Sequence, residues 1–151
     1  MKAEIKGLRE AQRKMDQVAR DLDGPPMVEA MRDATLVVTR SARQNAPVDT
    51  GRLRASIVPQ VVQHSQIVRG IVGSNVAYAP YMELGTRPHW PPLSALVMWA
   101  RRHGLTAFLV ARAIARHGIK ARRFLQRALM DNRNKIGEIF SRTVGHIVRK
   151  E

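Results

Sequence analysis

The 151-residue chain contains no cysteine. Disulfide cross-links, thiol catalysis and cysteine-ligated zinc are therefore excluded, and packing must supply the stability, helped by any contacts between subunits. Acidic residues are also few, since 12 Asp and Glu stand against 26 Lys and Arg, which gives a formal net charge of +14. A chain this basic fits an acidic partner, such as nucleic acid or an acidic protein surface.

Long apolar runs are missing as well. No segment approaches the roughly 20 apolar residues that a membrane-spanning helix needs, and the N-terminus lacks the hydrophobic region of a secretory signal. We therefore expect a soluble, unexported chain with no membrane partner. Hydrophobic residues make up 44% of the chain, too many for a disordered basic tail. The length fits one folded domain, or one domain with an arm.

Two amphipathic helices are predicted at the start of the chain. From Glu4 to Leu22, apolar residues recur at steps of three and four, the spacing of one helical face. Gly24 should end this helix, and Pro25 suits the first turn of a second one. The second helix must end near Asn45, because a proline at position 47 moves the residue before it out of the helical region. We expect the two helices to pair. The predicted buried stripe of the second helix is Met27, Met31, Ala34, Val38 and Ala42.

A β-hairpin is predicted after a short capped turn. Residues 57–63 and 67–73 are rich in Val and Ile and are separated by three polar residues, which is typical of two paired strands. Pro59 indicates an edge strand. A third strand is expected near residues 119–124.

Three further helices are expected in the C-terminal half. Residues 93–103 and 105–117 each close with a basic residue, followed by Gly104 or Gly118. This arrangement favours the negative helix end and a left-handed cap. The last helix is predicted to run from Arg123 to about Val148 on its apolar periodicity.

Positive charge concentrates in the same half. Between residues 101 and 135 there are ten Lys and Arg and one acid, a net charge of +9. Such a region is suited to DNA phosphates or to an acidic protein surface, because a merely solvated face would carry its self-repulsion without a partner. The candidate contact residues are Arg101, Arg102, Arg112, Arg116, Lys120, Arg122, Arg123 and Arg127.

Asp49-Thr50-Gly51 is the tripeptide of aspartic proteases. A homodimeric protease with one triplet per subunit is a distant alternative, because arginines at 52 and 54 would favour two ionised carboxylates over the shared proton that the mechanism needs. The preferred interpretation is a turn in which Asp49 or Thr50 caps a short helix. No two histidines have metal-ligand spacing, and nucleophile elbows and phosphate-binding loops are absent. We therefore expect no enzyme activity, metal, cofactor or small-molecule substrate.

Three spaced stretches resemble one protein family. They are Ala46-Pro47-Val48-Asp49-Thr50-Gly51-Arg52-Leu53-Arg54-Ala55-Ser56-Ile57, Val76-Ala77-Tyr78-Ala79-Pro80-Tyr81-Met82-Glu83-Leu84-Gly85-Thr86 and Arg123-Phe124-Leu125-Gln126-Arg127-Ala128-Leu129. Their order and contents are similar to the gene-product-ten-like neck proteins of long-tailed bacteriophages, also called head-tail joining, tail-completion or minor tail proteins. The resemblance covers about residues 27–129 and departs from compact members at a longer helical insert, about residues 90–120. The fold motif it implies is Pro47, Asp49, Thr50, Gly51, Leu53, Ser56, Tyr78, Tyr81, Glu83, Gly85, Thr86, Phe124 and Leu125.

The resemblance implies a structural virion protein without catalytic residues. Its expected place is a neck ring of identical subunits that joins the DNA-filled head to the tail, after synthesis in the host cytoplasm. Expected neighbours are head-closure, tail terminator or tail tube proteins, with DNA in the channel as a further candidate. The rival hypothesis is a DNA-binding protein without sequence specificity that uses the arginine-rich C-terminal half.

The expected fold class is α+β, a small antiparallel sheet with a hairpin, packed by long N-terminal, central and C-terminal helices. Residues 1–23 are predicted to form an amphipathic assembly arm, and residues 24–151 a single domain that carries the insert.

Overall fold

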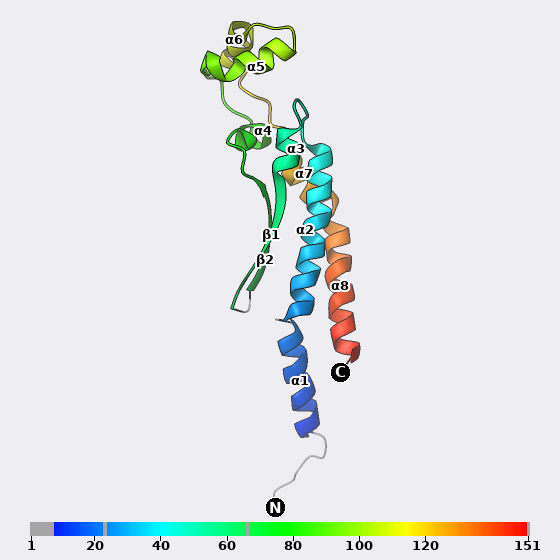
Figure 1. Cartoon of the computed structure of the whole chain (residues 1–151). Helices are drawn as coiled ribbons and strands as arrows, with labels where there is room; N and C mark the ends of the chain where they lie inside the picture. The colour runs from blue at the N-terminus through cyan, green and yellow to red at the C-terminus, as the bar shows by residue number, and fades with distance from the viewer. Residues whose placement is uncertain (1–7, 23, 66, 151) are drawn as a thin grey trace, which may run out of the picture. The chain divides into compact units, whose positions relative to one another are not determined.

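The computed structural model describes residues 8–22, 24–65 and 67–150, and it confirms the α+β class (Figure 1). The helices and the one hairpin of the described residues are divided between two compact units. The first unit is drawn from residues 1–40, 59–72 and 131–151, and the second from residues 41–58 and 73–130. The elements in chain order are α1 (Leu8–Leu22), α2 (Pro25–Asn45), α3 (Arg52–Ser56), β1 (Ile57–His64), β2 (Ile67–Ser74), α4 (Ala79–Leu84), α5 (Leu93–Arg102), α6 (Ala107–His117), α7 (Phe124–Asp131) and α8 (Arg133–Lys150).

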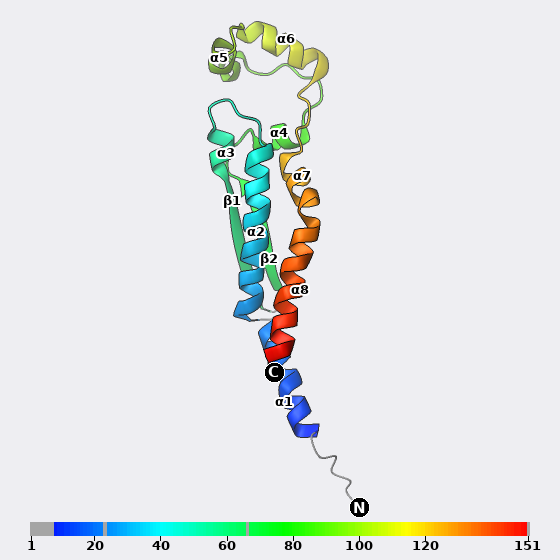
Figure 2. The same ribbon diagram turned by 90° about the vertical axis from the view of Figure 1, so that its right-hand side faces the viewer.

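Helix α2 forms the centre of the first unit, with α8 beside it (Figures 1 and 2). It begins and ends where the prolines predicted, at Pro25 and Asn45. In the expected stripe, the alanines and the valine are buried and the two methionines are half-buried. Thr35 and Thr39 are buried on the same helix. Their hydroxyls donate to backbone carbonyls of the preceding turn, at 2.8 and 2.7 Å, so neither polar group lacks a partner.

The hairpin lies against α2 at close range. A Cβ atom added at Gly70 of β2 would stand 2.5 Å from Cγ2 of Thr35 and 2.7 Å from Sδ of Met31. Glycine suits this close approach, because a methyl group at position 70 would force the side chains of Thr35 and Met31 to shift. The hairpin was predicted correctly, with each strand one residue longer than expected. Its two strands form a two-stranded sheet, so both are edges and Pro59 is tolerated.

Helix α1 packs against α8, a partner that the sequence did not indicate. The described part of the helix begins at Leu8, so the expected start at Glu4 lies outside the described residues. The prediction of the last helix was wrong in one respect. The single helix expected from Arg123 is broken into α7 and α8 at Asn132, which is buried. Asparagine interrupts helices because its short amide side chain competes for backbone hydrogen bonds.

The expected third strand is wrong. In the described residues, Ile119 forms one isolated antiparallel bridge with Thr86, and Phe124 already begins α7. The second unit instead centres on Ile57 and Phe124, the two largest fully buried side chains. Helices α5 and α6 pack against each other. They end as predicted, followed by Gly104 and Gly118 with φ of +67° and +69°.

Candidate functional site

We call the three stretches that resemble the family the first motif (residues 46–57), the second motif (residues 76–86) and the third motif (residues 123–129). The second and third motifs meet through Glu83. This half-buried carboxylate lies at the end of α4 and caps the N-terminus of α7, accepting hydrogen bonds from the backbone N–H groups of Leu125 (2.9 Å) and Gln126 (3.0 Å). Two backbone N–H groups of the first turn of α7 thus gain a charged acceptor, at the helix end that favours negative charge. The backbone N–H of Arg123 also donates to the Glu83 carbonyl, at 3.1 Å. Phe124 follows this contact directly and is fully buried.

Two glycines allow the chain to cross itself at the base of the insert. Thr86 and Ile119 exchange backbone hydrogen bonds of 2.9 and 3.3 Å, and the Thr86 hydroxyl accepts a third from Ile119 N–H at 3.0 Å. A Cβ at Gly85 would lie 2.5 Å from the Ile119 carbonyl oxygen, and one at Gly118 would lie 2.1 Å from that of Thr86. Both glycines have positive φ. We call residues 85–87 and 118–121 the insert crossing.

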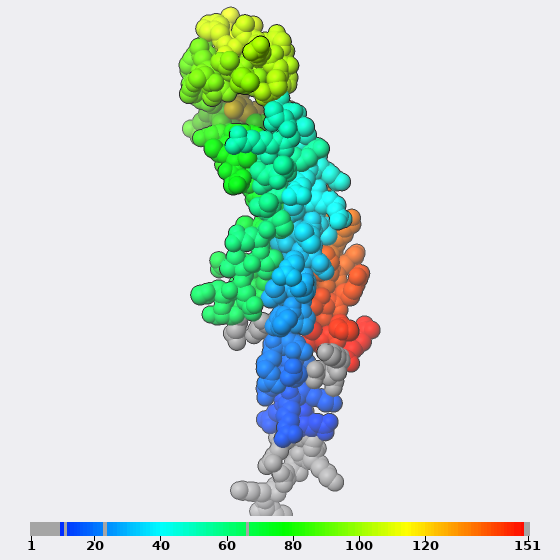
Figure 3. All heavy atoms as spheres, in the orientation of Figure 1, coloured from blue at the N-terminus to red at the C-terminus, as the bar shows by residue number. Residues whose placement is uncertain are grey.

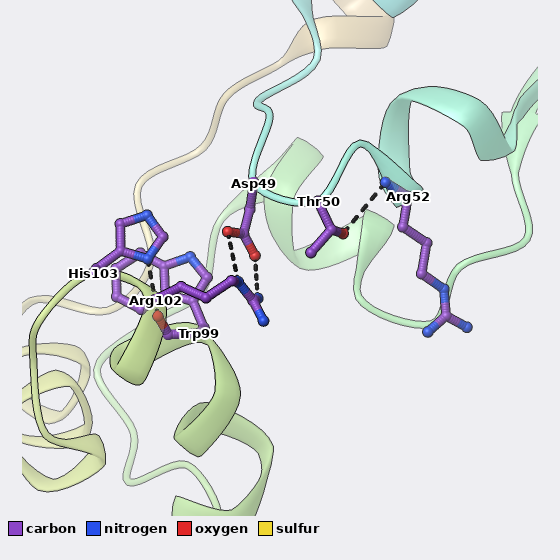
Figure 4. Close-up of polar contacts among 6 residues, drawn as sticks. All are labelled: Asp49, Thr50, Arg52, Trp99, Arg102 and His103. Atoms are coloured by element: carbon purple, nitrogen blue, oxygen red, sulfur yellow. Dashed lines mark hydrogen bonds and ion pairs between the residues drawn. The ribbon is translucent and has the colours of Figure 1, made fainter.

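The first motif forms a turn, but not the predicted cap. The N-cap residue of α3 is Gly51, at φ +80°, and no side chain caps this helix. Thr50 Oγ1 only approaches the N–H of Arg52, at 3.5 Å. Asp49 lies two residues before the N-cap position. Its carboxylate accepts hydrogen bonds from two guanidinium nitrogens of Arg102 at the end of α5, Nε at 3.0 Å and Nη2 (Figure 4). The predicted capping role of Asp49 is therefore wrong.

The ion pair stabilises the ionised form of the Asp49 carboxyl. Hydrogen bonding to Arg102 lowers the pKa of the Asp49 carboxyl below its ordinary value of 3.8, and the charge of His103 acts in the same direction. His103, the C-cap residue of α5, stacks on Trp99 of the same helix with ring centroids 4.0 Å apart. The two rings lie beside the Asp49–Arg102 pair (Figure 4). A carboxylate held ionised by a guanidinium is unsuited to the shared proton of an aspartic protease.

The first motif also anchors the start of the hairpin. Leu53 is buried, and the Ser56 hydroxyl donates to its carbonyl at 2.8 Å. The same hydroxyl lies 2.7 Å from Oγ of Ser74 at the end of β2. Arg43, which the sequence analysis did not single out, donates from Nε and Nη2 to the carbonyl of Ile57 at 3.0 and 2.8 Å. Nothing local in the sequence marks this contact.

Pro47, Tyr78 and Tyr81 are the motif residues not yet described. Pro47 is half-buried after α2, and Tyr78 and Tyr81 of the second motif are exposed. The backbone of Tyr81 nevertheless contributes to the end of α4, because its carbonyl accepts a 2.9 Å hydrogen bond from Gly85 N–H. The first motif thus contacts the end of β2 and the end of α5, whereas the second and third motifs join α4, α7 and the insert crossing.

The basic candidate residues belong to the insert and to the segment that follows it. They lie on α5, on α6, in the segment 118–123 and on α7, and all are exposed. Arg102 is engaged by Asp49. Among the described residues, the structure shows no ion pair for the other seven: Arg101, Arg112, Arg116, Lys120, Arg122, Arg123 and Arg127.

The insert is also unusually apolar at its surface. Its atoms form a lobe of their own in the space-filling view (Figure 3). Only Ala100 and Ala111 are buried on α5 and α6. Trp90 meets Phe108 edge to face, with centroids 5.7 Å apart, yet both rings are exposed. The other large exposed apolar side chains of the insert are Leu93, Val97, Met98, Trp99, Leu105 and Leu109. Exposed apolar surface of this extent is typical of interaction sites.

The described residues contain no cluster of His, Asp and Glu able to hold a metal ion. None of their helices is long and apolar enough to cross a membrane. Residues 9–85, about half of the chain, match the HK97-gp10-like family of bacteriophage tail components. The chain belongs to this family, as the first two motifs predicted, and is a structural component of a phage tail. No curated protein and no solved structure matches it.

Proposed function

We propose that this tail component is a neck or tail-completion subunit, and that it forms part of a ring that joins the DNA-filled head to the tail. The observation that carries the proposal is the seven exposed basic side chains on and beside the insert, without an ion pair among the described residues, in a chain of the tail-component family. Unpaired charge of one sign needs an acidic partner.

The partner that we favour is an acidic surface of the adjacent ring, formed by a head-closure, tail terminator or tail tube protein. The exposed apolar side chains of the insert support this choice, because a protein interface buries apolar and charged groups together. DNA is the second candidate, since arginine pairs with phosphate as well as with carboxylate. A tight phosphate grip would, however, retard DNA that must slide through a neck.

Complementation of a phage that lacks this gene tests the proposal. Without the chain, electron microscopy should show filled heads and separate tails. The double substitution Arg122→Glu and Arg123→Glu should reproduce this defect. Arg142→Glu with Arg149→Glu changes the net charge equally on exposed residues of α8, and these control particles should assemble. Joined particles in the absence of the chain would refute a role at the head–tail junction.

DNA binding by the purified chain separates the two partners. If DNA is the partner, affinity should be independent of sequence, with a log-log salt slope of about −0.9 for each phosphate neutralised. If an acidic ring is the partner, free DNA should bind weakly at physiological salt while the Arg122 and Arg123 double variant still fails to assemble. Double-variant particles that assemble and eject DNA normally would show that these two side chains are only solvated.

A further inference from the structure

Helix α6 carries apolar and cationic side chains together on one exposed face. Phe108, Arg112 and Arg116 follow one another at steps of four residues, the spacing that places side chains in one row along a helix. Leu109 stands three residues before Arg112 and borders the same row. All four residues are exposed, Phe108 by 54% and Leu109 by 51%. We call these four residues the outer face of α6.

The opposite side of α6 supplies its packing within the insert. Ala111 is fully buried there, and Ala107 and Ile114 are half-buried. The ring of Trp90 meets Phe108 edge to face and is itself 54% exposed, so it enlarges the aromatic part of the outer face. Aromatic and aliphatic side chains that gather at the surface in this way are typical of an interaction site.

The charge on the same face indicates the chemistry of the partner. From Leu84 to Met130 the sequence contains nine Lys and Arg and no Asp or Glu. In the part of the chain that the structure describes, neither Arg112 nor Arg116 has an ion pair. A partner that covers the apolar side chains must also take water from these two guanidinium groups, which is favourable only where acidic groups receive them. A second copy that docked through its own outer face would place arginine against arginine.

The apolar side chains favour a carboxylate partner over a phosphate partner. Duplex DNA is held mainly through its phosphates, by charged and polar contacts, and these would leave Phe108 and Leu109 in water. A protein interface instead buries aromatic and apolar side chains at its centre, with charged groups around them. Helix α6 has 11 residues, about three turns, a length suited to one helix of a partner.

We infer that the outer face of α6 is the docking site for an acidic amphipathic helix of another virion protein. Apolar side chains of that helix cover Phe108 and Leu109, and two of its carboxylates, four residues apart, pair with Arg112 and Arg116. This spacing follows because residues four apart on two helices are separated by the same distance. The inference rests on the proposed function and deepens it, since it narrows the acidic surface of the adjacent ring to one helix of defined pattern.

The test measures binding of a synthetic peptide to the purified full chain by isothermal titration calorimetry. The probe is an alanine-rich helix with two leucines on one face and, one turn further along that face, two glutamates four residues apart. The wild type should bind it. Arg112→Gln with Arg116→Gln should weaken binding by about tenfold or more, and Leu109→Ser by about tenfold, because each removes part of the contact.

Two controls separate this site from general attraction to a basic chain. Arg142→Gln with Arg149→Gln changes the net charge equally on exposed residues of α8, and this variant should bind the peptide like the wild type. A peptide with glutamines in place of both glutamates should bind at least about tenfold more weakly than the acidic one. Circular dichroism checks that each variant is folded, which is expected because the substituted side chains are exposed.

A wild-type chain that does not bind the acidic peptide would overturn the inference, as would an Arg112 and Arg116 double variant that binds like the wild type. Unchanged binding by Leu109→Ser would also overturn it, because charge alone would then hold the peptide, as it would hold DNA. None of these results touches the proposed function, which fails only if particles made without the chain still join heads to tails.

Discussion

Alanine at Gly118 probes whether the insert crossing depends on a missing side chain. Gly118 and Gly104 both follow a helix of the insert at nearly equal φ, +69° and +67°. A Cβ at Gly104 meets no atom within 4 Å, whereas one at Gly118 would lie 2.1 Å from the carbonyl oxygen of Thr86. Gly104→Ala is therefore the matched control, because it introduces the conformational cost of a left-handed alanine without the clash.

The difference between the two variants can be worked from the structure. An alanine with positive φ costs about 1–2 kcal/mol in the left-handed helical region, and at Gly118, where ψ is −165°, it costs about 1–3 kcal/mol because almost only glycine adopts that region. At Gly118 the clashing atom is backbone, so the Thr86 segment must move away from Ile119. That movement breaks the bonds donated by Thr86 N–H and Ile119 N–H, a further loss of about 2–3 kcal/mol. Gly118→Ala should therefore cost about 3–6 kcal/mol in total.

Urea unfolding followed by circular dichroism measures both free energies, and the comparison is valid where the denaturant slope is unchanged. Hydrogen exchange gives the local readout: the amides of Thr86 and Ile119 should exchange faster in Gly118→Ala and at the wild-type rate in Gly104→Ala. Equal destabilisation by the two substitutions, with unchanged exchange at Thr86, would refute the close-approach argument.

Two further predictions concern the carboxylates of Glu83 and Asp49. Glu83→Ala should destabilise the chain by about 1–2 kcal/mol more than Glu138→Ala on the exposed face of α8, because it removes a charged cap from α7; equal unfolding free energies would contradict the cap. The carboxyl of Asp49 should titrate below 3.8 by NMR and return towards that value in Arg102→Gln. Since the folded pKa is the lower one, stabilisation by the pair should be present above pH 3.8 and be lost as pH falls through the lowered pKa. A midpoint that Arg102→Gln leaves unchanged would contradict the pairing.

Local signals predicted the elements well wherever neighbouring residues decide the conformation. Proline cannot continue a helix, so α2 begins and ends where the prolines stand. Glycine alone adopts positive φ without strain, so the ends of α5 and α6 were correctly predicted at Gly104 and Gly118. The same locality explains the hairpin, whose turn and β-branched runs lie within eighteen residues of each other.

The errors arose where a distant residue decides. Asp49 has the side chain of a helix cap, and its preference for that role is local, yet Arg102 stands 53 residues away and offers a charged, two-pronged partner. The helix predicted from Arg123 carries an apolar period, but the structure divides it into α7 and α8 at the buried Asn132. Ile119 looked like part of a strand, although only Thr86 is available to pair with it.

The sequence by itself determined the family, the α+β class and the concentration of positive charge, because motifs, composition and residue period are properties of the chain in any conformation. Tertiary structure alone decided what the motifs do: Glu83 caps α7, Gly85 and Gly118 admit a backbone crossing, and Gly70 brings the hairpin onto α2. The physical reason is range. Propensities and caps act over a few residues, whereas these contacts join residues more than thirty positions apart, and only the folded chain brings them together.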